Sequence, residues 1–330
     1  VKQQTPEFLQ QAKTLLMLPD YFGFRLTGNK LSEYTNGSTT QLVNPDTFQW
    51  DKELIRKLGY PEDIFLPLQM PGTKVGQLLP EIQKEVGFDL EVVLCGSHDT
   101  ASAVMAVPQT EGDGIYISSG TWSLMGIESL KPVITEDAAA ANFTNEGGYD
   151  HRFRFLKNIM GLWMIQSVRH EYNDAYSFAQ LCNMAEESKE FPSRVDVNDQ
   201  SFLSPDSMVE AIRQYCHKTG QPVPESVGEL TSVVYRSLAQ SYGETVRGLE
   251  KIAGKTYDSI HIIGGGSNAA YLNQLTADAT GKTVYAGPGE ATAIGNLLAQ
   301  MIHAGDLADL KSARKCVRES FEIKTFAPAK

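Results

Sequence analysis

The sequence has little of what membrane-spanning and disulfide-stabilised proteins require. Its longest apolar run, Ile159 to Ile165, is far shorter than the ~20 residues needed to cross a bilayer. The first residues, Val1 to Pro6, lack the basic and then apolar plan of a signal peptide. The four cysteines form no C-x-x-C pair, which fits a reducing compartment better than a disulfide framework. We therefore expect a cytoplasmic protein without a membrane partner.

Positive charge is also scarce, and the sequence shows no metal-ligand spacing. The chain has 29 Lys and Arg residues against 40 Asp and Glu residues, a formal net charge of −11. Nucleic acids and anionic membranes need clustered Lys and Arg, so we expect neither as the main partner. This balance does not exclude ATP, because a nucleotide site needs only local positive potential or aligned backbone N–H groups. The six histidines are not spaced as zinc ligands.

The composition is that of an ordinary globular protein, and the sequence predicts strands that alternate with helices. The 330 residues, of which 42% are hydrophobic and 21% charged, suit two domains or one large one. A capping box at Ser226 and Glu229 predicts a long helix that ends at Gly254. The segments after it alternate strand, glycine turn and helix, which predicts an α/β layered fold. Pro108 to Gly114 combines Pro, Gly and acids and is the best candidate for a domain boundary.

Three further predictions concern apolar segments. Asn158 can cap a helix that runs to Tyr172 and carries apolar residues all around its axis, so this helix should be buried. Trp122 and Trp163 lie in apolar contexts, and we predict core positions for them rather than sugar-stacking platforms. His261 lies within a strand pattern, which predicts a packed or edge residue.

Asp99 is the first candidate for chemistry. It follows the short strand signal of residues 92–94 and directly precedes a helical stretch. Ligands of open α/β sheets collect at the carboxyl ends of strands, where a carboxylate can take a proton from a hydroxyl that attacks a phosphoryl group. Asp99 could equally do no more than cap the helix that begins at Thr100. Its position alone leaves both interpretations open.

Glycine-containing turns are the second kind of candidate. Ser118 to Thr121 joins two β-like runs into a predicted hairpin, whose N–H and hydroxyl groups could contact a phosphate, although most such turns are only hairpins. Gly264-Gly265-Gly266-Ser267 and Gly287-Pro288-Gly289-Glu290 each lie between a strand and a helix. Neither fits the dinucleotide or P-loop pattern. Together they suggest walls of one nucleotide pocket, whereas either alone would more often be plain turn chemistry.

Taken in order, these segments resemble the FGGY family of carbohydrate kinases. The resemblance runs through nearly the whole chain and rests on residues 15–21, 26–28, 71–76, 96–103, 119–121, 264–267, 274–278 and 290–295. Residues 98–100, 144–148 and 156–163 are similar, within that family, to members that phosphorylate L-rhamnulose.

The resemblance implies an α/β protein with two ribonuclease-H-like, actin-like ATPase domains around a cleft. Residues 1–107 would be the remainder of the sugar-binding N-terminal domain, and 108–305 the ATP-binding C-terminal domain. Residues 306–330 would form a tail that packs back on the first domain. The family's initial strand–turn–strand, with its acid and phosphate-binding turn, has no counterpart before Val1. We therefore expect an incomplete first domain and poor turnover by these 330 residues alone.

The resemblance also implies roles for individual residues. Asp99 would be the proton acceptor, and the residues in contact with the ketose would be His98, Asp99, Thr100 and Asn158. The ATP site would be lined by Thr121, Gln166 and Gly264. The implied reaction transfers the γ-phosphoryl group of ATP, with Mg²⁺ held largely by phosphates, to the 1-hydroxyl of L-rhamnulose. Another ketose, such as L-fuculose or L-ribulose, and a non-catalytic sugar- or nucleotide-binding module are the alternatives; the sequence leaves the oligomeric state and the Mg²⁺ ligands open.

Overall fold

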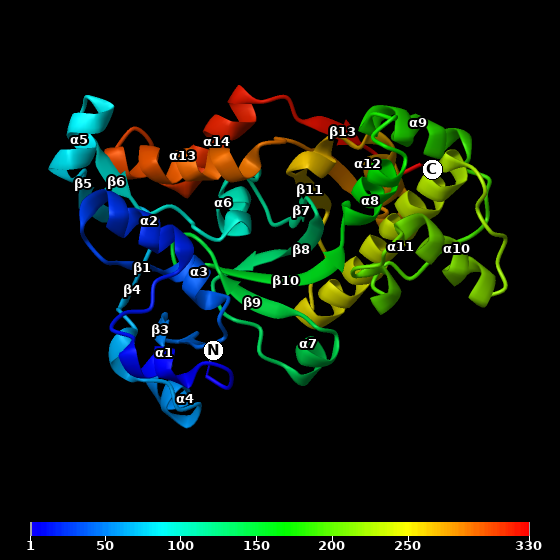
Figure 1. The fold of residues 1–330 in the computed structure, drawn as a ribbon. Coiled ribbons are helices and arrows are strands. Elements are labelled where there is room, and N and C mark those ends of the chain that lie inside the picture. The colour runs from blue at the N-terminus through cyan, green and yellow to red at the C-terminus, as the bar shows by residue number, and fades with distance from the viewer. Residues whose placement is uncertain (1, 330) are drawn as a thin grey trace.

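A seven-stranded mixed sheet organises the larger part of the molecule in a computed structural model that describes residues 2–329 (Figure 1). Its strands are β7 (Ile115–Ser119), β8 (Trp122–Ser129), β9 (Thr144–Gly147), β10 (Phe153–Met160), β11 (Ser259–Ile263), β12 (Thr283–Ala286) and β13 (Lys324–Phe326). Their order is β13-β12-β11-β7-β8-β10-β9, with β7, β11 and β12 parallel and β7, β8 and β10 antiparallel. The core order β10-β8-β7-β11-β12 is that of a ribonuclease-H-like domain.

One face of this sheet is covered by five helices that bury the larger hydrophobic core. They are α8 (Trp163–Glu171), α9 (Phe178–Glu187), α10 (Met208–Lys218), α11 (Val227–Ala253) and α12 (Ala270–Thr280). The predicted capping box of α11 is confirmed, since Ser226 and Glu229 satisfy each other's backbone N–H groups. The helix ends, as predicted, at Gly254, which adopts the left-handed conformation that glycine takes without strain (φ 62°).

The other face packs against α6 (Asp99–Met105) and α13 (Ala291–Ala304), which share a second core with Leu156 of β10. The helix α14 (Leu310–Ser320) packs beside both, and its Arg314 pairs with Glu128 of β8. Beyond α14, the chain returns to the large sheet. Its last strand, β13, pairs antiparallel with β12 because an edge strand of the large sheet offers free backbone groups there. The tail thus contacts α6 and α13 through α14, and β12 through β13.

Residues 2–98 form smaller elements around a minor core of Tyr34, Trp50, Ile55 and Leu68. The helices are α1 (Pro6–Gln11), α2 (Leu18–Thr27), α3 (Tyr34–Ser38), α4 (Lys52–Lys57) and α5 (Pro80–Val86). The strands β1 (Ser32–Glu33), β2 (Val43–Asn44), β3 (Gln49–Trp50), β4 (Leu68–Gln69), β5 (Lys74–Gln77) and β6 (Glu91–Val93) pair as three two-stranded sheets. Short remaining elements are η1 (Glu62–Ile64), α7 (Glu136–Ala140), η2 (Gln200–Phe202) and η3 (Gly265–Asn268).

The predicted hairpin of β7 and β8 is confirmed, but the predicted helix from Asn158 is wrong. Asn158 lies in β10, and α8 begins only at Trp163. An apolar run of this length suits a buried strand as well as a buried helix, and periodicity alone does not separate them. Gly161 lies between the two, and a larger residue does not fit there, since a Cβ would lie 2.7 Å from the Thr121 carbonyl oxygen.

Burial tests the predictions for His261 and Trp122, and the structure also bears on the cysteines and on membrane-spanning helices. His261 is confirmed as a packed strand residue, and burial lowers its pKa to about 4. The prediction for Trp122 is wrong: its side chain is 42% exposed at the start of β8. The four cysteines are free thiols. Across residues 2–329, helices long and apolar enough to span a bilayer are absent.

Candidate active site

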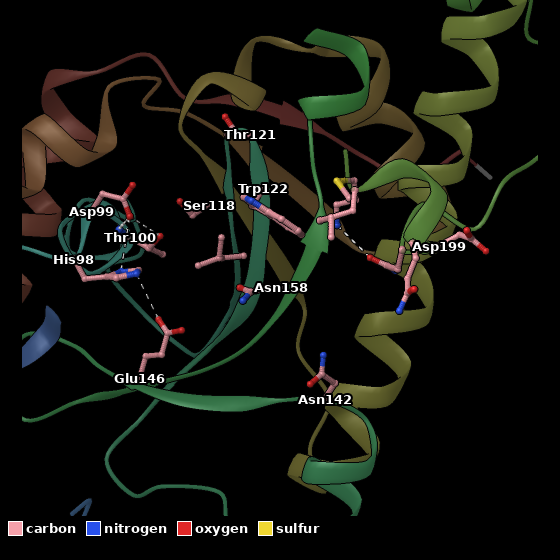
Figure 2. A pocket seen from close by; sticks show the side chains of 16 residues that line it. His98, Asp99, Thr100, Ser118, Thr121, Trp122, Asn142, Glu146, Asn158 and Asp199 are labelled. Atoms are coloured by element: carbon pink, nitrogen blue, oxygen red, sulfur yellow. Dashed lines mark hydrogen bonds and ion pairs between the residues drawn. The ribbon is translucent and has the colours of Figure 1, made fainter. Parts of the chain in front are cut away.

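A cavity of about 660 Å³ lies between the start of α6 and the strands β8 and β10 of the large sheet (Figure 2). One wall comes from His98, Asp99 and Thr100 at the start of α6. The opposite wall comes from the β7–β8 turn and from the loop at Asn198 and Asp199. The floor is built by two strands, because Asn158 is paired with Leu124, and Met160 with Trp122, in the β8–β10 register. Directly opposed residues point to the same face of a sheet, so these four side chains line the cavity together.

Asp99 is the first residue of α6, where the helix dipole favours a carboxylate. Its Oδ1 accepts hydrogen bonds from the backbone N–H of Thr100 (2.6 Å) and from the Thr100 hydroxyl (3.2 Å). The side chain is 79% exposed, and Oδ2 has no hydrogen-bond partner among the described residues. The carboxylate is thus oriented by one oxygen and open to a ligand at the other. Asp99 both begins the helix and faces the cavity, so its two interpretations are compatible.

A buried glutamate holds the loop that carries Asp99. Glu33 is fully buried, and its carboxylate accepts hydrogen bonds from Thr35, Asn36 and Ser97. Ser97 donates from both its N–H (3.1 Å) and its hydroxyl (2.6 Å). Burial raises the pKa of Glu33 above its usual value, and these hydrogen bonds only partly oppose that shift. Because Ser97 precedes His98 and Asp99, Glu33 fixes the chain at the point where it enters the site.

The ring of His98 lies between Arg154 and Glu146 (Figure 2 shows His98 and Glu146). Arg154 is fully buried in β10, and its Nη2 lies 3.3 Å from Nδ1 of His98 and 3.1 Å from Oε2 of Glu146. Nε2 of His98 lies 4.0 Å from the same Glu146 oxygen. Burial, followed by the charge of Arg154, lowers the pKa of His98. The imidazole is therefore neutral at physiological pH.

The two glycine junctions lie side by side behind the β7–β8 turn. The N–H of Gly264 donates to the carbonyl of Pro288 (3.1 Å), which joins the junctions directly. A Cβ on Gly264 would lie 2.9 Å from the Ser119 carbonyl oxygen, and one on Gly266 would lie 2.0 Å from the Ser119 hydroxyl. Glycine is required there because β7 and the triple-glycine turn approach so closely.

The structure brings most of the predicted site residues to one cavity, but not all of them. His98, Asp99, Thr100, Thr121 and Asn158 line it. Gln166 and Gly264 do not. Both lie near the β7–β8 turn instead. The N–H of Leu162, just before α8, donates to the Gly120 carbonyl, and Gln166 follows one helical turn later. Gly264 lies against Ser119 at the end of β7.

Sequence reasoning missed several residues that build the site, notably Glu33, Glu146 and Arg154. Arg154 carried a signal that could have been used, since an arginine between Phe153 and Phe155 in an apolar run is seldom buried without a partner. Its partner Glu146 lies directly opposite in the β9–β10 register, which the sequence does not disclose.

Comparisons with known proteins agree with this architecture. Residues 1–106 match the N-terminal domain, and residues 115–304 the C-terminal domain, of the FGGY family of carbohydrate kinases. The chain is 51% identical to a rhamnulokinase of Halalkalibacterium halodurans over 329 residues, which is 100% of this chain and 70% of that protein. It is 46% identical to a rhamnulokinase of Bacillus subtilis over 325 residues, 98% of this chain and 67% of that protein.

Solved structures share the fold at low sequence identity. A xylulose kinase from Rhodospirillum rubrum superposes with a TM-score of 0.73 at 14% identity, covering 99% of this chain and 66% of that one. A glycerol kinase with ADP from Plasmodium falciparum gives 0.74 at 15% identity, with the same coverage. Both family domains match, and the rhamnulokinases are highly identical over nearly all of this chain. These findings lead to one conclusion. The chain belongs to the FGGY family of carbohydrate kinases and is an ATP-dependent sugar kinase.

Proposed function

We propose that this protein transfers the γ-phosphoryl group of ATP to the 1-hydroxyl of L-rhamnulose, giving L-rhamnulose 1-phosphate and ADP in cytoplasmic rhamnose catabolism. The observation that carries the proposal is the cavity in which Asp99 and Thr121 lie on opposite walls. The similarity to rhamnulokinases across the chain supports the choice of ketose.

In the proposed mechanism, Asp99 accepts the proton of the sugar hydroxyl through its open carboxylate oxygen. The hydroxyl oxygen attacks the γ-phosphorus, the bond from that phosphorus to the β–γ bridging oxygen breaks, and ADP leaves. Most of the acceleration comes from holding both substrates in line, because phosphoryl transfer depends on positioning more than on the base.

Sugar and nucleotide would occupy opposite ends of the cavity. His98, Thr100 and Asn158 would contact the ketose, since they surround Asp99 on the α6 side and on the sheet floor. Thr121, Gln166 and Gly264 would contact the nucleotide at and behind the β7–β8 turn. Gln166 and Gly264 lie outside the cavity wall, so their contacts would be to parts of ATP that extend past Thr121.

Mg²⁺ fits this site as an ion that arrives with the phosphates. Residues 2–329 hold no cluster of three or more His, Cys, Asp or Glu side chains suited to a metal. Protein-bound Mg²⁺ commonly uses only one or two carboxylates plus phosphate oxygens and waters, and Asp99 and Asp199 line the cavity. When bound, the ion would neutralise charge on the phosphates, while the protein's residues orient the substrates.

The proposal is tested by an ADP-release assay across L-rhamnulose, L-fuculose and L-ribulose, with calorimetry of sugar and nucleotide binding. We expect L-rhamnulose to have the highest kcat/KM, and Asp99→Asn to lower kcat by about 10²–10⁴-fold while both substrates still bind. Asp113→Asn is the matched control, because Asp113 pairs with Lys255 on the surface and should leave kcat unchanged.

The alternatives are separate outcomes of the same assay. A preference for L-fuculose or L-ribulose would reassign the substrate and leave the kinase activity intact. Binding of sugar and nucleotide without ADP release would favour a non-catalytic binding module only if ADP release is also absent when the family's initial strand–turn–strand is fused to the chain. Full activity of Asp99→Asn would remove Asp99 as the base.

A further inference from the structure

Arg154 determines which nitrogen of His98 carries the proton. Arginine has only donors, so the contact between Arg154 Nη2 and His98 Nδ1, at 3.3 Å, makes Nδ1 the acceptor. The neutral ring then carries its hydrogen on Nε2. Within residues 2–329, Nε2 has no hydrogen-bond acceptor in range, since the nearest carboxylate oxygen lies 4.0 Å away. His98 thus presents an unused N–H donor at the cavity wall.

Glu146 presents an acceptor beside this donor. Its side chain is 13% exposed and lines the cavity. Its Oε2 is buried next to Arg154, at 3.1 Å from Nη2, and has no hydrogen-bond partner among the described residues. The ion pair with the fully buried Arg154 holds the carboxylate in place.

A donor and an acceptor this close together match the chemistry of a single hydroxyl group. Hydrogen bonds of about 2.8 Å from one hydroxyl oxygen can reach groups about 4–5 Å apart, because the oxygen accepts one bond and donates the other. The distance of 4.0 Å between Nε2 and Oε2 lies at the near end of that span, so the Glu146 carboxylate lies beside the His98 donor at a separation that one hydroxyl can bridge.

We propose that Glu146 is a specificity-determining residue for the sugar. Its carboxylate accepts a hydrogen bond from a non-reacting hydroxyl of the ketose, and the same hydroxyl oxygen accepts the Nε2–H of His98. Arg154 is a positioning residue that fixes the His98 tautomer and the Glu146 carboxylate without touching the sugar. This inference rests on the proposed function only in requiring that a ketose binds beside Asp99.

Glu146→Gln tests the proposal against a panel of ketoses that each lack one hydroxyl. We expect the variant to raise the sugar KM, or the sugar Kd by calorimetry, about 10- to 100-fold for the complete ketose. For one analogue in the panel, wild type and Glu146→Gln should bind equally, because the hydroxyl read by Glu146 is missing. The nucleotide KM should not change.

Glu128→Gln is the matched control, because Glu128 lies opposite Arg154 on the other neighbouring strand and pairs with Arg314 away from the cavity. It should alter stability without altering discrimination among the analogues. A second measurement, the ¹⁵N chemical shifts of the His98 ring, should show a neutral Nε2–H tautomer at neutral pH.

The outcomes separate this inference from the proposed function. If the best substrate is a ketose other than L-rhamnulose, the proposed function fails, and the panel is built on that ketose instead. If no analogue abolishes the difference between wild type and Glu146→Gln, or if the His98 proton lies on Nδ1, the inference is overturned while the kinase activity stands.

Discussion

Substitution of Gly295 by alanine tests whether the packing of α6 against α13 holds Asp99 in position. A Cβ at residue 295 would lie 1.8 Å from the carbonyl oxygen of Ser102 and 2.4 Å from its carbonyl carbon. Ordinary contact begins near 3.4 Å, so the two helices must separate by about 1.6 Å. The obstacle is backbone, which cannot rotate aside. Ser102 also donates its hydroxyl to Gly96 (2.7 Å), so a shift of α6 pulls on the loop before Asp99.

Two effects of opposite sign set the magnitude. Replacing glycine by alanine within a helix stabilises by about 0.5–1 kcal/mol, whereas overpacking a well-packed contact costs about 1–3 kcal/mol. We expect Gly295→Ala to lower the free energy of unfolding by about 1–2 kcal/mol. The effect on activity should be larger, because a misplacement of about 1 Å in a catalytic group can cost about 10²-fold.

Chemical denaturation and the ADP-release assay, with sugar calorimetry alongside, measure the two effects. Gly248→Ala in α11 is the matched control, since the nearest atom to its Cβ would be Phe143 Cε2 at 3.9 Å. We expect that variant to be stabilised by about 0.5–1 kcal/mol with unchanged kinetics. A Gly295→Ala protein with wild-type stability and wild-type kcat/KM would refute the reasoning, because the helices would then not be in close contact.

Three further predictions concern stability. Burial raises the pKa of Asp20 to about 6 from 3.8, so the folded state holds a proton that the unfolded state has released, and stability falls as pH rises through this window. Asp20→Asn should flatten that slope and stabilise by about 1–2 kcal/mol above pH ~7 in denaturant titrations, whereas the exposed Asp46→Asn should not. Tyr242→Phe leaves the buried Ser123 hydroxyl without its 2.6 Å partner and should lower the unfolding free energy by about 1–3 kcal/mol; no loss would mean that water replaces the phenol. Ser226→Ala removes the cap of α11 and should lower the melting temperature through a loss of about 1 kcal/mol, an effect that Ser226→Asp should not show.

The sequence by itself determined the features that depend on neighbours along the chain. The hairpin at Gly120, the capping box at Ser226 and the helix end at Gly254 were predicted because turn and cap residues act over three or four positions. The same holds for Asp99, whose place between a strand and a helix is local. The family resemblance added roles to these residues, and the family itself is confirmed by the comparisons.

Only the tertiary structure decided how the site is built. Asn158 proved to be a strand residue because a buried apolar segment takes its conformation from the sheet beside it, not from its own pattern. Glu33 meets Ser97 across 64 positions, and Arg154 meets His98 across 56. A buried charge must find partners, but the chain does not place them nearby, so their identity is fixed only when distant segments fold against each other.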